Sequence, residues 1–178
     1  MNPKNTLCLI VDIQERLLPA LSGADEMVKR CRLLIQGLTA LDVSFAVTEQ
    51  YPKGLGNTVS AVSLLLPEGT PVVEKTRFSA FLPEIQEILR KNDIKNVILM
   101  GAEAHICMLQ TALDLKAQGY AVSLPFECTA SRTTANRDNG LAQLSRQGII
   151  ISNVESILFQ LLGDAKHPAF KTISKLIQ

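Results

Sequence analysis

The sequence predicts an α/β protein built on a six-stranded parallel sheet with helices on both faces. Three observations lead to this fold class. Six short apolar runs alternate with segments of helical periodicity. The first run, Thr6–Val11, is apolar on both faces, as expected of a central parallel strand. No linker or repeat divides the 178 residues, a length that fits one domain. We therefore expect a single domain over residues 1–178.

The apolar runs and periodic segments give the expected elements in chain order. The six expected strands are Thr6–Val11, Val43–Val47, Pro71–Glu74, Val97–Met100, Tyr120–Leu124 and Gly148–Ile151. Expected helices are Asp25–Leu41, Pro83–Lys91, Cys107–Leu115, Thr134–Gln147, Val154–Leu162 and a last one from Pro168, with Thr58–Leu66 short or irregular. A doubly wound sheet of order 3-2-1-4-5-6 accounts for this alternation. Strands one and four are then neighbours where the winding reverses, and ligands bind outside the carboxyl ends of the strands at that point.

Composition disfavours several classes of function. The net charge is +1 and no basic run stands out, so we expect neither nucleic acid nor a membrane surface as a partner. The apolar segment Leu7–Val11 is too short for a signal or transmembrane segment, which favours a cytoplasmic protein. The cysteines show no CxxC or CxxH spacing, so a zinc site or redox pair is not expected. The four cysteines are Cys8, Cys31, Cys107 and Cys128.

Three chemically active residues follow strands at the carboxyl edge of the predicted sheet. Asp12 follows the first strand, Lys75 the third, and Cys107 lies six residues after Gly101, where the fourth strand ends. A thiol in the first turn of a helix faces unpaired N–H groups and the helix dipole, which can hold its pKa below the free value of about 8.5. A carboxylate can accept the thiol proton, and an ammonium group favours the thiolate. The N–H groups of the turn from Gly101 to Cys107 can bind an oxyanion.

Each of these residues also has an ordinary structural interpretation. Cys107 can be a small core residue, Asp12 a cap of the following turn, and Lys75 a solvated surface lysine. His105 can be a structural hydrogen-bonding residue, and Glu103 an acid that interacts with the helix dipole. Their common edge and complementary chemistry favour a catalytic site.

At this point the motifs resemble the isochorismatase-like cysteine hydrolase family over essentially the whole chain. The segment from Asp12 to Gln14 is similar to its opening D-x-Q, and Lys75–Phe81 is similar to its lysine motif. Gly101–Cys107 is similar to its G-x-E-x-x-x-C nucleophile motif. Within the family, Glu49–Gly56 and Leu158–Phe170 most resemble the isochorismatase domain-containing protein 2 group.

The resemblance implies a Rossmann-like three-layer α/β/α sandwich with an Asp12–Lys75–Cys107 catalytic triad. It also implies a cis peptide bond between Ala102 and Glu103. The N–H groups of Glu103 and Cys107 would then form the oxyanion hole.

Five further residues are candidates for the substrate-binding wall. They are Gln14, Tyr51, Leu55, Phe78 and Phe81, with ordinary core packing as the alternative for the two phenylalanines.

A metal site is not expected. Nicotinamidases of the broader superfamily carry an Asp-x-His pair and a further histidine after the second strand, and these residues bind a metal. The corresponding stretch here, Glu49–Pro52, contains no histidine, and His105 and His167 are the only histidines in the chain. We expect neither a metal nor another cofactor.

The functional hypothesis is a cysteine-dependent hydrolase of a small amide or related carbonyl compound, acting through a thioester. A hydrolase of an isochorismate-like vinyl ether is one alternative. Another is a catalytically silent or weakly active oligomeric interaction protein that retains the fold. The apolar helix Val154–Leu162 and the last helix favour a homo-oligomer. A nucleotide-binding Rossmann protein is disfavoured because no GxGxxG follows the first strand.

Overall fold

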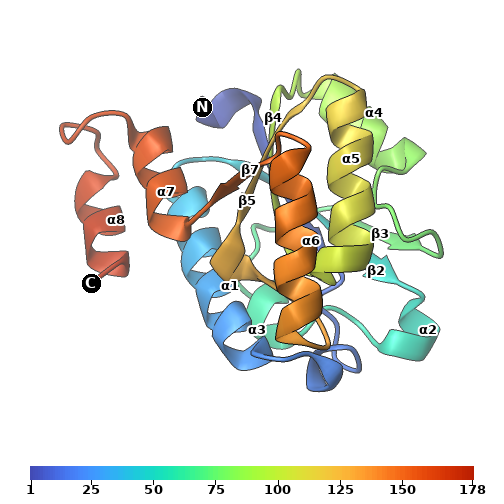
Figure 1. Ribbon diagram of the computed structural model, residues 1–178. Coiled ribbons are helices and arrows are strands. Elements are labelled where there is room, and N and C mark those ends of the chain that lie inside the picture. The colour runs from blue at the N-terminus through green and yellow to red at the C-terminus, as the bar shows by residue number, and fades with distance from the viewer.

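A parallel sheet forms the centre of the structure, a computed structural model that describes residues 1–178 (Figure 1). The strands are β1 (Thr6–Val11), β2 (Ser44–Gln50), β3 (Val72–Lys75), β4 (Asn96–Ala102), β5 (Ala121–Pro125), β6 (Thr129–Ala130) and β7 (Ile150–Ser152). Six of them follow the order β3-β2-β1-β4-β5-β7, and the two-residue β6 pairs with β4. The predicted order 3-2-1-4-5-6 is confirmed, with β7 as the sixth expected strand.

Helices cover both faces of the sheet, which gives the predicted three layers (Figure 1). The α-helices are α1 (Ala24–Thr39), α2 (Pro52–Leu55), α3 (Ser60–Ser63), α4 (Pro83–Lys91), α5 (Leu109–Ala117), α6 (Thr134–Arg146), α7 (Val154–Leu162) and α8 (Phe170–Leu176). Helices α1, α3, α7 and α8 pack on one face, and α4, α5 and α6 on the other. None of these helices has the length and apolar character needed to cross a membrane.

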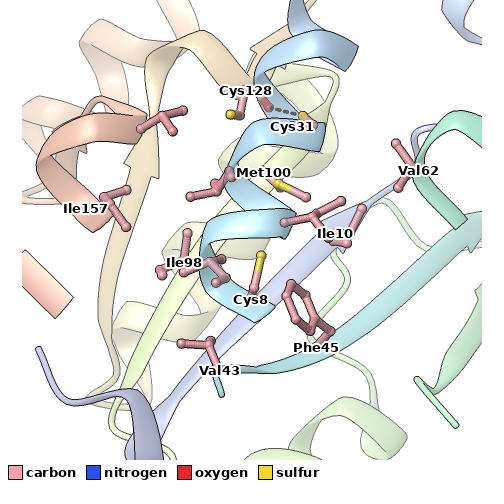
Figure 2. Packing of buried hydrophobic residues seen from close by; sticks show 14 of the residues in the cluster. Cys8, Ile10, Cys31, Val43, Phe45, Val62, Ile98, Met100, Cys128 and Ile157 are labelled. Carbon is pink, nitrogen blue, oxygen red and sulfur yellow. Dashed lines mark hydrogen bonds between the residues drawn. The ribbon is translucent and has the colours of Figure 1, made fainter. Parts of the chain in front are cut away.

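The central strand β1 supplies side chains to both hydrophobic cores. Cys8 and Ile10 point towards α1, where they join Ile98 and Met100 of β4 (Figure 2). The alternate residues of β1 join the core beneath α4, α5 and α6. Burial on both faces explains why Thr6–Val11 contains no alternation of polar and apolar residues.

The main departure from the predicted elements lies at Cys107. The helix expected to begin there begins at Leu109, and Cys107 lies within a π-helical turn over Ala104–Met108. The N–H of Met108 donates to the carbonyl of Glu103, five residues earlier. The sequence could not reveal this wide turn, because the apolar residues that follow it in α5 keep the spacing of an ordinary helix.

Gly101 allows β4 to approach β1 beside Asp12. Its φ is +130°, and a Cβ atom there would lie 1.9 Å from the carbonyl oxygen of Val11. Since that oxygen belongs to the central strand, the clash cannot be relieved by a side-chain movement. Glycine is therefore required where the sheet leads into the segment that carries Cys107.

We predict that Gly101→Ala lowers the free energy of unfolding by at least about 3 kcal/mol, because the methyl group overlaps main-chain atoms. Gly119→Ala is the matched control, since Gly119 also has a positive φ, +87°, but no atom lies within 4 Å of its added Cβ. That control should lose only about 1 kcal/mol. Equal losses for the two variants in urea unfolding would contradict this account.

Candidate active site

Three predicted catalytic side chains meet at the carboxyl edge of the sheet. Lys75 Nζ lies 2.7 Å from Asp12 Oδ2 and 3.6 Å from Cys107 Sγ. Asp12 directly follows β1, Lys75 ends β3, and Cys107 lies in the π turn after β4. The exposed fractions of the three residues are 0%, 4% and 8%. The lysine thus lies within hydrogen-bonding range of both a carboxylate and a thiol in a site that largely excludes water.

Oxygen atoms surround the ammonium group of Lys75. Besides Asp12, three oxygen atoms lie within hydrogen-bonding distance of Lys75 Nζ: Gln50 Oε1 at 2.6 Å and the carbonyl oxygens of Phe78 at 3.0 Å and Arg77 at 3.2 Å. The three ammonium protons are shared among these four oxygens. These oxygens replace the water that a buried ammonium group loses. They also fix the direction in which the lysine side chain enters the site.

Thr48 and Gln50 support the buried ion pair, and neither was predicted from the sequence. Thr48 Oγ1 donates to Asp12 Oδ1 at 3.0 Å, while Gln50 contacts Lys75. Two polar residues spaced i and i+2 share one face of a strand. That spacing was the available signal, but the second strand was expected to end at Val47, whereas β2 continues to Gln50.

Burial governs the titration of the acid and the thiol. Burial raises the pKa of Asp12 above its usual value, and the nearby Lys75 ammonium opposes this rise. Burial, with the negative charge of Asp12, raises the pKa of Cys107 to about 12 despite the opposing effect of Lys75. The expectation of a thiol pKa below the free value is therefore wrong. Desolvation outweighs the lysine, so Cys107 is a protonated thiol at neutral pH in the resting site.

The segment before Cys107 presents a free main-chain donor. The peptide bond between Ala102 and Glu103 is cis, and this is the bond for which the family resemblance implied a cis conformation. The N–H of Glu103 donates to no acceptor in the protein. The Glu103 side chain is held by Arg132, whose Nη2 and main-chain N lie 2.7 and 2.9 Å from its oxygens. Although partial burial acts in the opposite direction, these hydrogen bonds lower the pKa of Glu103.

Neighbouring elements hold the π turn from the outside. A Cβ atom on Gly140 of α6 would lie 2.9 Å from main-chain atoms of Ala104 and His105, so the helix packs directly on the turn. His105 Nδ1 lies 3.0 Å from Ser131 Oγ. This contact agrees with the structural interpretation of His105. No group of three His, Cys, Asp or Glu side chains is arranged to hold a metal ion.

Two predicted pocket residues flank the triad as exposed aromatic side chains. Tyr51 and Phe78 are 56% and 54% exposed. The main-chain N–H of Tyr51 donates to the carbonyl oxygen of Lys75, and the carbonyl of Phe78 accepts from Lys75 Nζ. The main chain of both residues therefore lies beside the lysine, and contact of their rings with a substrate stays a prediction.

The other three candidates for the substrate-binding wall differ in position. Gln14 is fully buried, and its side-chain amide joins Gln50 to Gly56. Leu55 ends the short helix α2 and is partly exposed. The expectation for Phe81 is wrong. Its ring packs 6.4 Å, centre to centre, from that of Tyr120 beside the start of β5, and both line a cavity of about 420 Å³ that contains no triad residue.

We predict strong coupling between the charges of Asp12 and Lys75. Asp12→Asn and Lys75→Met should each lower the free energy of unfolding by about 3–5 kcal/mol, because each leaves one buried charge without its partner. The double variant should lose less than the sum of the two single losses. Urea unfolding at pH 7.5 measures the cycle, and additive losses would show that the pair is not energetically linked.

We also predict that Cys107 alkylates slowly at neutral pH. Because its pKa is raised to about 12, its rate with iodoacetamide should rise through pH 10 without levelling off. The rate of a short unstructured cysteine peptide, measured in parallel, should be half-maximal at about pH 8.5, the ordinary thiol pKa, and level off about one unit above it. Peptide mass spectrometry follows Cys107 separately from the other cysteines. A plateau for Cys107 below pH 9 would indicate a thiolate that burial has not suppressed.

Comparison with known proteins places the chain in a family. The Isochorismatase domain model matches residues 6–156. Isochorismatase domain-containing protein 1 from Salmo salar is 41% identical over 177 residues, which cover 99% of this chain and 62% of that protein. Isochorismatase domain-containing protein 2 from Xenopus laevis is 33% identical over 178 residues, which cover 99% and 85%. The chain thus spans less than two thirds of the length of the salmon relative.

Solved structures agree with the fold. A structure described as MAR1 ribonuclease from Caenorhabditis elegans matches with a TM-score of 0.96 and 37% identity, over 99% of this chain and 91% of that one. An octameric hydrolase of unknown specificity from Escherichia coli matches with a TM-score of 0.91 at 16% identity, over 99% and 88%, a likeness of fold alone. The match to the domain model and the identity with the two vertebrate relatives show that this chain belongs to the isochorismatase family.

Proposed function

We propose that this chain is a cysteine hydrolase of small, uncharged carbonyl compounds, with amides as the main substrate class. The observation that carries the proposal is the position of Lys75 Nζ, 2.7 Å from the Asp12 carboxylate and 3.6 Å from the Cys107 thiol. Asp12 is the base, Cys107 the nucleophile, and Lys75 the positive charge that stabilises whichever of the two is anionic. This assignment gives each of the three buried side chains a role in the reaction.

The first half of the reaction forms a thioester. Asp12 accepts the proton of Cys107 Sγ, and the sulfur attacks the carbonyl carbon while the electrons of the C=O bond move to oxygen. The N–H groups of Glu103 and Cys107 stabilise this oxyanion, a role supported by the unpaired N–H of Glu103. The C–N bond then breaks, and Asp12 returns the proton to the leaving amine.

The second half hydrolyses the thioester. Asp12 accepts a proton from water as the water oxygen attacks the acyl carbon. The C–S bond breaks, the acid product leaves, and the proton on Asp12 returns to the sulfur. Because burial keeps the Cys107 thiol protonated at neutral pH, the thiolate forms only when Asp12 removes the proton during the attack.

The charge balance favours an uncharged substrate over an isochorismate-like vinyl ether. Lys75 is paired with Asp12 at 2.7 Å. Arg132, the cation that contacts the turn carrying the nucleophile, is paired with Glu103, also at 2.7 Å. Isochorismate carries carboxylates, and a site for it needs cations that are free to bind them. Lys75 and Arg132 therefore already have carboxylate partners.

Two alternative functions are a ribonuclease and a silent interaction protein. The Caenorhabditis elegans relative is described as a ribonuclease, but the net charge of +1 does not favour RNA binding. A silent interaction protein would retain the fold without turnover. We propose a homo-oligomer in either case, in keeping with the exposed Phe159 of the apolar helix α7.

We predict that wild-type protein hydrolyses at least one member of a panel of small amides and carbamates. Cys107→Ala should lower that rate by about 10³-fold or more, because the nucleophile is lost. Cys31→Ala, a change at a buried core thiol, is the matched control and should keep the wild-type rate. Full turnover by Cys107→Ala would exclude the covalent mechanism. Turnover of isochorismate or RNA instead of any amide would overturn the substrate class, and no turnover at all would favour the silent protein.

A further inference from the structure

The loop that follows Lys75 is attached to the helix that follows Cys107. This segment, residues 76–82 and called here the lysine loop, has no regular secondary structure. Ser79 Oγ donates to Asp114 Oδ2 of α5 at 2.6 Å. One helical turn earlier on α5, Thr111 makes a second attachment, and its hydroxyl is fully buried.

Thr111 bridges the lysine loop and the main chain at Cys107. Its Oγ1 donates to the carbonyl oxygen of Cys107 at 2.6 Å and accepts from the main-chain N–H of Ala80 at 2.8 Å. A hydroxyl has one proton to donate and lone pairs to accept, so a single Thr111 side chain satisfies both groups. Both partners are buried, which makes each lost hydrogen bond costly.

The same loop also holds the lysine at its other end. The carbonyl oxygens of Arg77 and Phe78 accept hydrogen bonds from Lys75 Nζ. Phe78 is only two residues from Ala80, the residue that Thr111 binds. The Thr111 hydroxyl therefore connects the main chain that carries the nucleophile to the loop that holds the cation 3.6 Å from Cys107 Sγ.

We propose that Thr111 is a positioning residue that sets the distance between Lys75 and Cys107; this assignment rests on the proposed cysteine chemistry. Without the hydroxyl, the Ala80 N–H is buried without an acceptor, and the lysine loop shifts to satisfy it. Lys75 then moves relative to the sulfur, and its stabilisation of the thiolate weakens. Thr111 itself touches no substrate.

Replacement of Thr111 separates positioning from simple core packing. Thr111→Val keeps the shape but removes both hydrogen bonds, whereas Thr111→Ser keeps the hydroxyl. Thr6→Val is a matched control, because Thr6 is also fully buried and donates to a main-chain carbonyl, that of Asn2, away from the site. Circular dichroism and urea unfolding identify folded variants, and Thr111→Ala replaces Thr111→Val if the latter does not fold.

The alkylation rate of Cys107 and the hydrolysis rate are measured between pH 7 and 10. Thr111→Val should alkylate Cys107 about tenfold more slowly, equivalent to a thiol pKa about one unit higher, and kcat should fall at least as much. Thr111→Ser and Thr6→Val should stay within about twofold of wild type. If folded Thr111→Val alkylates Cys107 at the wild-type rate or faster, or keeps the wild-type kcat, the proposal is overturned.

The two readouts also distinguish failure of this proposal from failure of the proposed function. Alkylation requires no substrate, so it tests Thr111 even when no compound in the panel is hydrolysed. A substrate that Cys107→Ala still hydrolyses would disprove the covalent mechanism without changing the expected alkylation rates. Normal alkylation by Thr111→Val, together with cysteine-dependent hydrolysis, would disprove the role of Thr111 alone.

Discussion

The site depends on an ion pair that is almost wholly removed from water. The side chains of Lys75 and Asp12 are 0% and 1% exposed and lie 2.7 Å apart. Burial of two charges is costly unless other polar groups satisfy them. Here Thr48 binds the carboxylate, and Gln50 with two main-chain carbonyls binds the ammonium. Strands β1, β2 and β3 and the lysine loop therefore position the groups that make burial of this ion pair possible.

The same burial determines how the thiol can react. Removal from water raises the pKa of Cys107 to about 12, and the lysine only partly offsets this. A thiolate is therefore rare in the resting protein, and in the proposed mechanism attack on a substrate depends on proton transfer to Asp12. A protonated thiol is also a poor nucleophile towards chance electrophiles. The proposed chemistry thus links reactivity to the presence of a carbonyl group in the site.

Sequence patterns predicted the fold and placed Asp12, Lys75 and Cys107 at one edge of the sheet, where their side chains do meet. Their catalytic roles, inferred from their chemistry and the family resemblance, stay a prediction. Apolar runs without alternation identified the parallel strands, and residues after such strands share one edge. The patterns missed features that depend on tertiary contacts. The π turn at Cys107 leaves the apolar periodicity of α5 unchanged, and the titration of its thiol depends on burial. The position predicted for Phe81 was wrong because the lysine loop runs along α5, to which Thr111 binds it. Thr48 and Gln50 were not predicted because β2 continues beyond Val47, the expected end of the strand.

Geometry and charge together favour acyl transfer through sulfur. The buried thiol has the Asp12 carboxyl group to accept its proton and a nearby unpaired N–H to stabilise an oxyanion, while Lys75 and Arg132 are paired with carboxylates. The most direct test is mass spectrometry of wild-type protein quenched in acid during turnover of an amide substrate. The account predicts an added mass equal to the acyl group on the peptide that contains Cys107. The account would be contradicted if turnover continues at saturating substrate while the Cys107 peptide never carries the added mass and hydroxylamine traps no acyl group.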